Sequence, residues 1–316
     1  MTNKPTLEQS PFLSQVWTWK PNFGQLLIVL GVSIVVKTIF SFIKETLFGL
    51  QGGITSFLID NLVFIPLFCV LFVSVHRVSL HSIFNTEIPI RIKHIIIGLG
   101  AGLFVFAVEM GINIMFTGVK DYTFDVSLEN LIPALIAGLL LGTAYALKLS
   151  IGLGYVYKTL LYWFRFPLLC IPFVILYMEH ESIYLLIRYK AFDWIPYMLL
   201  NSLVMVIMIT WVSMDDGLEL IAGYGISASL FSNFIARTGS GAGAWGRTIV
   251  ELELKSEGFG ASWMGIIFRI LMLLLLTVAI AKVLNWSNWR GRMRERYTKQ
   301  VAEDEWGDKI DEIGSS

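Results

Sequence analysis

Charged residues are scarce in this chain. Asp, Glu, Lys and Arg make up 15% of its 316 residues, while apolar residues make up 55%. A soluble domain of this length needs far more charge to cover its surface, so the composition excludes an ordinary soluble protein. The 24 basic residues equal the 24 acidic ones in number. We therefore expect no nucleic-acid partner, because proteins that bind nucleic acids concentrate basic residues on one surface.

Cysteine and histidine are rare as well, with two and four copies. Both cysteines lie in apolar runs and are predicted to be buried, small apolar side chains. His76, His81 and His94 lie in or beside the polar stretch 77–93, where a surface or interfacial position is expected. The sequence contains no CxxC pair and no HExxH motif. With so few potential ligands, we expect no metal site and no cofactor.

Long apolar runs dominate the sequence. A helix crosses the hydrocarbon core of a bilayer with about 20 mostly apolar residues. Runs of about this length predict an all-α fold, a polytopic membrane helix bundle with about eight transmembrane helices. The eight runs are residues 24–43, 55–76, 94–117, 130–147, 167–189, 194–214, 217–236 and 263–284. An amphipathic stretch, 148–165, is expected between the fourth and fifth runs.

The runs divide the chain into three parts. Residues 1–22 mix aromatic side chains with Lys and are predicted to form an interfacial segment. Residues 23–285 are the predicted transmembrane domain, and residues 286–316 are a charged tail. Membrane lipid is therefore an expected partner of this chain.

Basic residues predict the orientation, because cytoplasmic loops of membrane proteins carry an excess of Lys and Arg. They gather in the loop 77–93, after the fourth run and in the tail, which lie on one side if eight helices span. The loop 119–130 has one Lys against three acidic residues, as expected outside. We expect a multi-pass protein of the cell (inner or plasma) membrane with both termini cytoplasmic. In the last outer loop, TIVELEL alternates like a short strand, which predicts a hairpin or a contact edge.

Four ionisable residues fall inside the predicted spans: Lys37, Asp60, Glu109 and Arg269. Each lies about five to eight residues from the outer end of its helix, which predicts one layer in the outer half of the bilayer. Charges at membrane depth face a partner or a cavity. This intramembrane polar layer is expected to be either an ion-paired contact between helices or a binding cavity.

A second polar group interrupts the fifth run, where Glu179, His180 and Glu181 follow an apolar stretch. If the helix stops there, it spans only half of the hydrocarbon core; if it continues through SIYLLIRY, the three residues lie at membrane depth. A histidine beside carboxylates suits a general base or a metal ligand. Adjacent residues on a helix point in different directions, so these three alone do not define a site.

The stretch DDGLELIAGYGISASLF, residues 215–231, resembles the closing motif of the CPBP family. These are the CAAX-processing and bacteriocin-processing intramembrane proteases. Residues 216–220 and Gly223 match that motif. Gly225 stands where the family has its catalytic His, and Ser229 stands where it has an Asn.

Two upstream stretches extend the resemblance to a core of about 130–236. In WFRFPLLCIPFVILYMEH, His180 keeps the His of the family's second motif. In ALKLSIGLG, Lys148 and Leu149 replace the two Glu of the first motif, and Leu153 replaces its Arg. The resemblance implies a membrane core of the CPBP (Abi-like) kind in which the groups that activate water in the family are missing.

This combination predicts a pseudoprotease, because a general base contributes about 10²–10⁴-fold to such a reaction. The leading hypothesis is a non-catalytic scaffold, accessory subunit or regulatory, immunity-type partner in a membrane complex, with a membrane-protein partner. One alternative is an active intramembrane endopeptidase with a rearranged site, in which His180 acts with Glu109, Glu179 or Glu181. Another is a transporter or lipid-handling protein built on the intramembrane polar layer, although no inverted repeat supports it.

Overall fold

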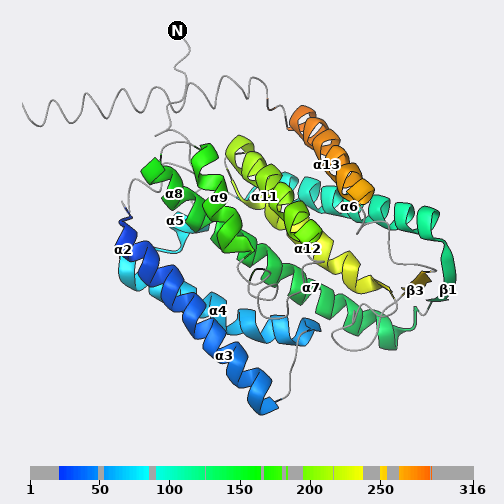
Figure 1. The fold of residues 1–316 in the computed structure, drawn as a ribbon, viewed down its shortest axis with the longest axis horizontal. Helices are drawn as coiled ribbons and strands as arrows, with labels where there is room; N and C mark the ends of the chain where they lie inside the picture. Colours follow the sequence, from blue (N-terminus) through cyan, green and yellow to red (C-terminus); the bar gives the residue numbers. More distant parts are fainter. Residues whose placement is uncertain are drawn as a thin grey trace, which may run out of the picture.

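A computed structural model shows a mostly helical protein with one small sheet (Figure 1). The predicted interfacial segment lies outside the described residues except for its last two positions, and the predicted tail lies outside them except for Trp286. The structure describes residues 21–48, 53–84, 90–124, 126–164, 167–179, 183, 195–215, 217–237, 250–254, 263–284 and 286.

Helices occupy most of the described chain, and their bounds follow the apolar runs closely. The helical elements are α2 (Phe23–Leu26), η2 (Leu27–Gly31), α3 (Val32–Phe48), α4 (Gly53–His76), α5 (His81–Phe84), α6 (Ile92–Thr117), α7 (Leu128–Ile151), η3 (Gly152–Val156), α8 (Tyr157–Phe164), α9 (Pro167–Met178), α11 (Ile195–Asp215), α12 (Glu219–Phe234) and α13 (Trp263–Val283). Here η2 and η3 are single wide π-helical turns inside longer helices. Five predicted runs coincide with helices to within a few residues.

Three helical stretches of the described chain are long and apolar enough to cross a membrane: Phe23–Lys44, Ile92–Phe116 and Leu128–Phe164. Large apolar side chains cover much of their outer surfaces, including Phe42, Phe104 and Leu140. Exposed apolar surface on this scale is expected for a protein whose solvent is lipid. The larger number of eight spans remains a prediction.

The fourth run does not end where the sequence predicts. A span at 130–147 followed by a separate amphipathic stretch was expected, but Leu128–Phe164 is one continuous helix of 37 residues. The charge of Lys148 suggested that the span ends at residue 147. The side chain of Lys148 is nevertheless buried inside the bundle. The π turn η3 accommodates Gly152 and Gly154 without breaking the helix. At 1.5 Å per residue this helix is about 55 Å long, well beyond the hydrocarbon thickness of about 30 Å.

One other predicted span is shorter than expected, and another can be followed only in part. The helix α9 ends at Met178 and a turn follows at Glu179; apart from Ile183, the rest of the fifth run, His180 included, lies outside the described residues. The helix α12 has 16 residues and ends where strand β2 (Ile235–Arg237) begins. It lies between α6 and α7, its two principal neighbours (Figure 1).

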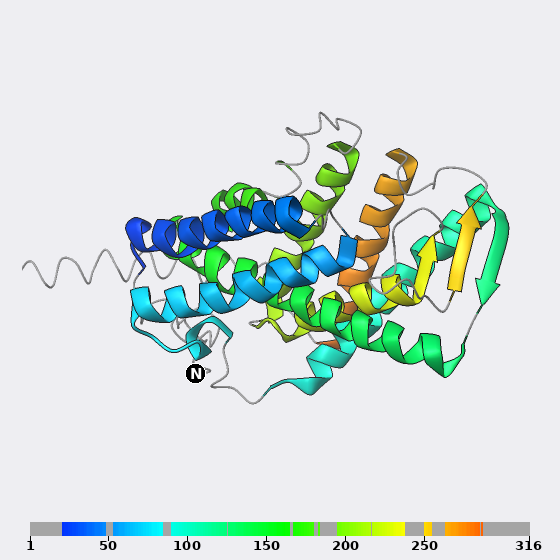
Figure 2. The ribbon, with the colours of Figure 1, turned by 90° about the horizontal axis from the view of Figure 1, so that it is seen from below.

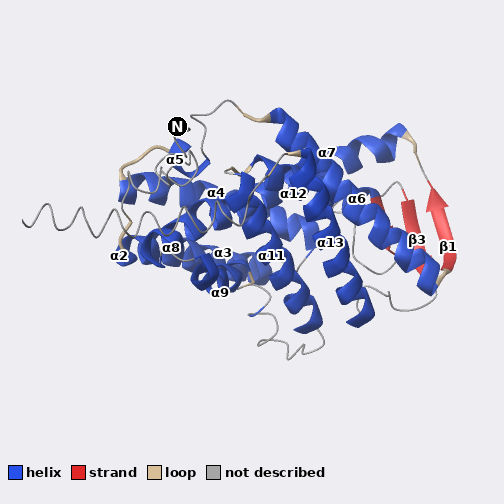
Figure 3. Ribbon diagram, turned by 90° about the horizontal axis from the view of Figure 1, so that it is seen from above, coloured by secondary structure: helices blue, strands red, loops and turns tan. Residues whose placement is uncertain are grey.

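A three-stranded sheet stands at one end of the bundle (Figures 2 and 3). Its order is β1 (Val119–Phe124), β3 (Val250–Leu254), β2, with β1 antiparallel and β2 parallel to β3. The all-α prediction was therefore incomplete. The strand predicted from TIVELEL is confirmed as β3, but its partners come from distant parts of the chain rather than from a local hairpin.

Glycine allows α12 to pack closely on both neighbours. A Cβ atom at Gly98 of α6 would collide with the carbonyl oxygen of Leu220, and one at Gly102 would collide with Ser227. On the other side, a Cβ at Gly142 of α7 would lie 2.8 Å from the carbonyl oxygen of Ile226. Helices in membranes associate through small residues in this way, because close backbone contact replaces a hydrophobic driving force.

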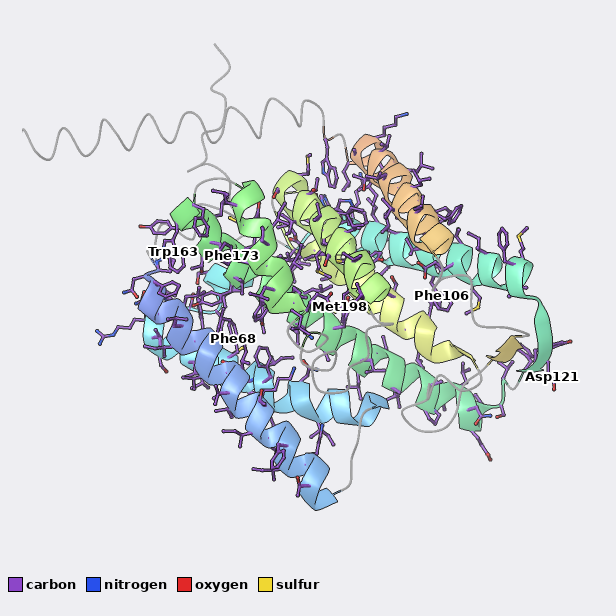
Figure 4. The ribbon with its side chains drawn as sticks, viewed as in Figure 1. Phe68, Phe106, Asp121, Trp163, Phe173 and Met198 are labelled. Atoms are coloured by element: carbon purple, nitrogen blue, oxygen red, sulfur yellow. The ribbon has the colours of Figure 1, made fainter. Side chains whose placement is uncertain are left out.

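A different kind of core surrounds η3, where large side chains fill the space. Phe68, labelled in Figure 4, and Phe72 each make an edge contact with Tyr155 at centroid distances of 5.3 and 5.4 Å. Tyr155 also bonds His76, whose Nε2 lies 2.9 Å from the Tyr155 hydroxyl. His76 is therefore buried in the core, and its predicted surface position is wrong.

Candidate functional site

Apolar packing occupies the positions that the CPBP resemblance marks as catalytic. Leu149 and Leu153 have no exposed surface. Gly225 lies directly opposite Leu149, since a Cβ at Gly225 would be 3.2 Å from Cδ1 of Leu149 and 3.2 Å from Cδ1 of Tyr145. The structure thus places Leu149 next to Gly225. The side chains of Leu149 and Tyr145 fill the space beside this glycine. The side chain of Ser229 lies outside the described residues.

Two ionisable side chains are buried on the elements around this packing. Lys148 on α7 is 9% exposed, and Glu179 in the turn after α9 is 5% exposed. Glu179 lies close enough to Tyr145 for its charge to act on the tyrosine hydroxyl. Its predicted companions His180 and Glu181 lie outside the described residues, so the proposed rearranged site is represented here by Glu179 alone. Glu109 lies on a separate element, α6.

A polar junction forms where α6 begins, α11 ends and α12 begins. It consists of Arg91, His94, Asp215 and Glu219, which lie up to 128 residues apart in sequence. Arg91 contacts both carboxylates: its Nη2 is 2.6 Å from Oε2 of Glu219 and 3.1 Å from Oδ2 of Asp215. Its Nε also donates to Glu219, over 3.3 Å.

Arg91 also closes the end of α11. Its Nη1 donates to the backbone carbonyl oxygen of Asp215 at 2.7 Å, and the last carbonyls of a helix have no partner within the helix. Gly217 gives the guanidinium room, because a Cβ there would collide with Nη2 of Arg91. The planar guanidinium suits this task, since its donors are fixed in a fork that matches carboxylate oxygens.

His94 completes the junction. Its Nδ1 lies 2.7 and 2.9 Å from the two carboxylate oxygens of Asp215. The sequence predicted a surface or interfacial histidine; the side chain of His94 is 19% exposed, while the carboxylate it bonds is 1% exposed. The carboxylate fixes the orientation of the imidazole, as in sites where a histidine moves protons or binds a ligand.

The environment of Asp215 acts on its ionisation. Asp215 lies one residue beyond the predicted span 194–214. Burial raises the pKa of Asp215, and the positive charge of Arg91 and the hydrogen bond to His94 oppose that rise. The junction can therefore hold the adjoining ends of α6, α11 and α12 together. None of its four residues is a serine, threonine or cysteine that a histidine could activate.

The retained residues of the family-like motif that the structure describes contribute to packing or to this junction. Glu219 binds Arg91, and Gly217 makes room for it. Leu218 lies against Gly154, where an added Cβ would be 2.9 Å from its Cδ1. Leu220 is fully buried, and Gly223 lies against the backbone of α6 at Ile95. Asp216 lies outside the described residues.

The intramembrane polar layer is divided between two helix pairs. Lys37 and Asp60 lie on the neighbouring helices α3 and α4, while Glu109 and Arg269 lie on the neighbouring helices α6 and α13. These pairs are on opposite sides of the bundle (Figure 1). Lys37 is 7% exposed, and its Nζ lies 5.3 Å from the centre of the Phe64 ring. The side chains of Asp60 and Arg269 lie outside the described residues.

Polar side chains beside η3 connect the long helix to two other segments, α11 and α5. The Tyr157 hydroxyl lies 2.7 Å from Oγ of Ser213 on α11. Lys158, which has no exposed surface, donates from Nζ to the carbonyl oxygens of Ser82 and Ile83, each at 3.2 Å. Sequence reasoning counted Lys158 among the basic residues after the fourth run, on the cytoplasmic side, and did not predict its burial.

One sequence signal could have found the docking of α12. The stretches GLGAG at 98–102 and GLLLG at 138–142 both contain GxxxG, the spacing that places two glycines on one face of a membrane helix. No comparable signal marks Arg91 and Asp215, because an ion pair over 124 residues leaves no local pattern.

No protein-family model, no curated protein and no solved structure matches this chain. Among the described residues, no group of three or more His, Cys, Asp and Glu side chains is placed to hold a metal ion.

Proposed function

We propose that this chain is a divergent, non-catalytic relative of the CPBP intramembrane proteases that acts as a scaffold or accessory subunit in a membrane complex. The observation that carries the proposal is the contact of Gly225 with side-chain carbon atoms of Leu149 and Tyr145. A hydrolase needs a base, a water molecule and an oxyanion donor within hydrogen-bond reach of each other. Leucine and glycine side chains supply none of these groups.

The division between kept and lost residues supports the same proposal. The motif residues that are kept, including Gly217, Leu218, Glu219 and Gly223, hold α12 in place. The residues that are lost would have carried out the chemistry. Among the catalytic positions of the resemblance, His180 alone keeps the family's residue, without the Glu, Arg and second His that act with it. This pattern fits a binding platform better than a hydrolase.

We also propose a multi-pass placement in the cell membrane with both termini cytoplasmic. Three apolar stretches of membrane length support it. A bundle with this much lipid-exposed surface offers several helix faces to another membrane protein, and its partner is then an integral membrane protein rather than a soluble one.

The test is affinity purification of the tagged chain from its native membrane in mild detergent, with native mass determination. We expect one stoichiometric membrane-protein partner. A matched variant, Arg91→Ala, weakens the docking of α12 and should reduce recovery of that partner, whereas Lys93→Ala, at an exposed neighbouring position, should not.

A cleavage assay provides the opposing outcome. Membranes with the wild-type chain and with the double variant Glu179→Gln, His180→Ala are compared on peptide substrates. The proposal expects no cleavage by either. Recovery of a lone monomer together with cleavage that depends on His180 would replace it with the endopeptidase alternative.

A further inference from the structure

The small sheet lies where two candidate membrane spans end. The helix α6 ends at Thr117 and β1 begins at Val119, while β1 ends at Phe124 and α7 begins at Leu128. Both helices belong to stretches long and apolar enough to cross a membrane. Such short connections keep β1 near the level at which the hydrocarbon core gives way to the headgroups.

Large aromatic side chains are exposed on β1. Tyr122 is 68% exposed and Phe124 is 66% exposed. Residues two positions apart in a strand share one face of the sheet, so both side chains belong to the same face. Asp121 directly precedes Tyr122 in the strand, so its side chain belongs to the other face. Asp121 is also exposed.

The register extends this difference across the sheet. Tyr122 pairs with Leu252, and Phe124 pairs with Val250, so apolar residues occupy these paired positions. Asp121 pairs with Glu253, and Thr123 pairs with Glu251. On β1 and β3, one face is thus assigned apolar positions and the other is assigned acidic and polar ones. On β2, Ile235 and Arg237 belong to the first face and Ala236 belongs to the second, so the apolar face also carries one basic residue.

Exposed apolar side chains also precede and follow β1 along the chain. At the end of α6, Met115 is 81% exposed and Phe116 is 65% exposed. On the other side of β1, Val126 and Leu128 are 49% and 70% exposed. The exposed apolar side chains therefore follow one another from the first helix, through the strand, to the second helix.

We propose that the apolar face of this sheet contacts the lipid bilayer, with Tyr122 and Phe124 in the interfacial region and the acidic face toward water. The proposal rests on the membrane placement proposed above. Aromatic side chains are enriched at this depth because their rings suit the boundary between headgroups and acyl chains. The continuity with the helix surfaces favours lipid over a protein as the occupant of this face.

The test uses fluorescence quenching along β1. In a background with Cys69→Ala and Cys170→Ala, single cysteines are introduced by Asp121→Cys, Tyr122→Cys, Thr123→Cys and Phe124→Cys and labelled with an environment-sensitive fluorophore. Each full-length chain is reconstituted in phosphatidylcholine vesicles. Quenching is then measured with nitroxide-labelled lipid and with iodide in the water. We expect lipid quenching at 122 and 124 and iodide quenching at 121 and 123, an alternation with the period of a strand.

A probe at Phe104→Cys, on the exposed surface of α6, is the control for membrane placement. Lipid quenching at 104 with only iodide quenching at 122 and 124 would overturn the sheet proposal and leave the membrane placement intact. Shielding of 122 and 124 from both quenchers would also overturn it, because a protein or a second copy would then cover the face. Absence of lipid quenching at 104 would remove the membrane placement and this proposal together. None of these outcomes depends on whether a partner protein is found.

Discussion

Two regions of this protein are packed by opposite means. Between α6, α12 and α7 the backbones approach closely, because the glycines at 98, 102 and 142 carry no side chain toward α12. Around η3 the space is filled by large rings and aliphatic chains, and hydrogen bonds such as that of Tyr157 with Ser213 fix them. The first region tolerates no added atom, while the second tolerates changes of shape but not the loss of a polar partner.

The difference between the two regions shows which contacts fix the position of α12. Close backbone contact requires one residue type at each position, so α12 has one depth and one rotation between its neighbours. Side-chain packing can adjust, because rotamers at the end of a flexible chain can move by a few tenths of an ångström. The predictions below test this contrast.

The largest effect is expected in the glycine-packed region. Gly98→Ala should lower the free energy of unfolding by about 3 kcal/mol, because its Cβ would collide with the backbone oxygen of Leu220, which cannot move aside. Gly100→Ala is the matched control on the same helix, since nothing lies within 4 Å of its added Cβ. It should change stability by no more than about 1 kcal/mol in the favourable direction. Unfolding in mixed micelles, followed by the intrinsic fluorescence of the tryptophans, which include buried Trp211, measures both. Equal effects would contradict the contrast.

The next effect concerns the polar junction that holds α12 at its first turn. Arg91→Ala should cost about 2 kcal/mol, less than the ~3–5 kcal/mol for a fully buried pair, because Arg91 is partly exposed. It leaves the buried carboxylate of Asp215 with His94 as its remaining partner in the junction. The same unfolding measurement on Lys93→Ala should show little change. A loss below about 0.5 kcal/mol for Arg91→Ala would mean that the junction is a surface ion pair.

A smaller effect is expected in the region around η3. Tyr157→Phe removes one buried hydrogen bond while keeping the ring, so we expect a loss of about 1 kcal/mol. The double variant Tyr157→Phe, Ser213→Ala removes both partners and should cost less than the sum of the single changes. A double-mutant cycle measures the coupling, and strict additivity would show that the two hydroxyls do not interact in solution.

The smallest effect is expected at Gly225, where the two kinds of packing meet. A Cβ there would meet the ends of two side chains at 3.2 Å rather than backbone. The crowding and the helix-forming gain of alanine should nearly cancel, so Gly225→Ala should change the free energy of unfolding by less than about 1 kcal/mol. A loss as large as that of Gly98→Ala would show that Leu149 and Tyr145 cannot move, and the contrast would then disappear at this position.

Several features of the fold could be predicted from the sequence. The helices α4, α6, α11 and α13 match predicted runs, because the length of an apolar run is a local property that helix formation follows directly. Strand β3 was predicted for a similar reason, from its alternating pattern. The continuity of Leu128–Phe164 was not, since a lysine within an apolar run cannot be assigned to a loop or to a buried position without knowing its neighbours.

The candidate site was predicted only in part. The expectation that Leu149 and Gly225 occupy related positions came from the resemblance to a family, and the structure places them in contact. The roles of Arg91 and His94 were missed, because each depends on Asp215, more than 120 residues away along the chain. The burial of His76 and Lys158 was not predicted for the same reason: burial of a polar group becomes evident only once its partner is known.

The sequence by itself determined that this protein is mostly helical and strongly apolar, with stretches long enough to cross a membrane, since these properties depend on composition and run length alone. Only the tertiary structure decided which glycines lie between helices, which charges meet at the polar junction, and which strands complete the sheet. Those contacts join residues far apart in the chain, and their energies depend on distances and burial that no local pattern encodes.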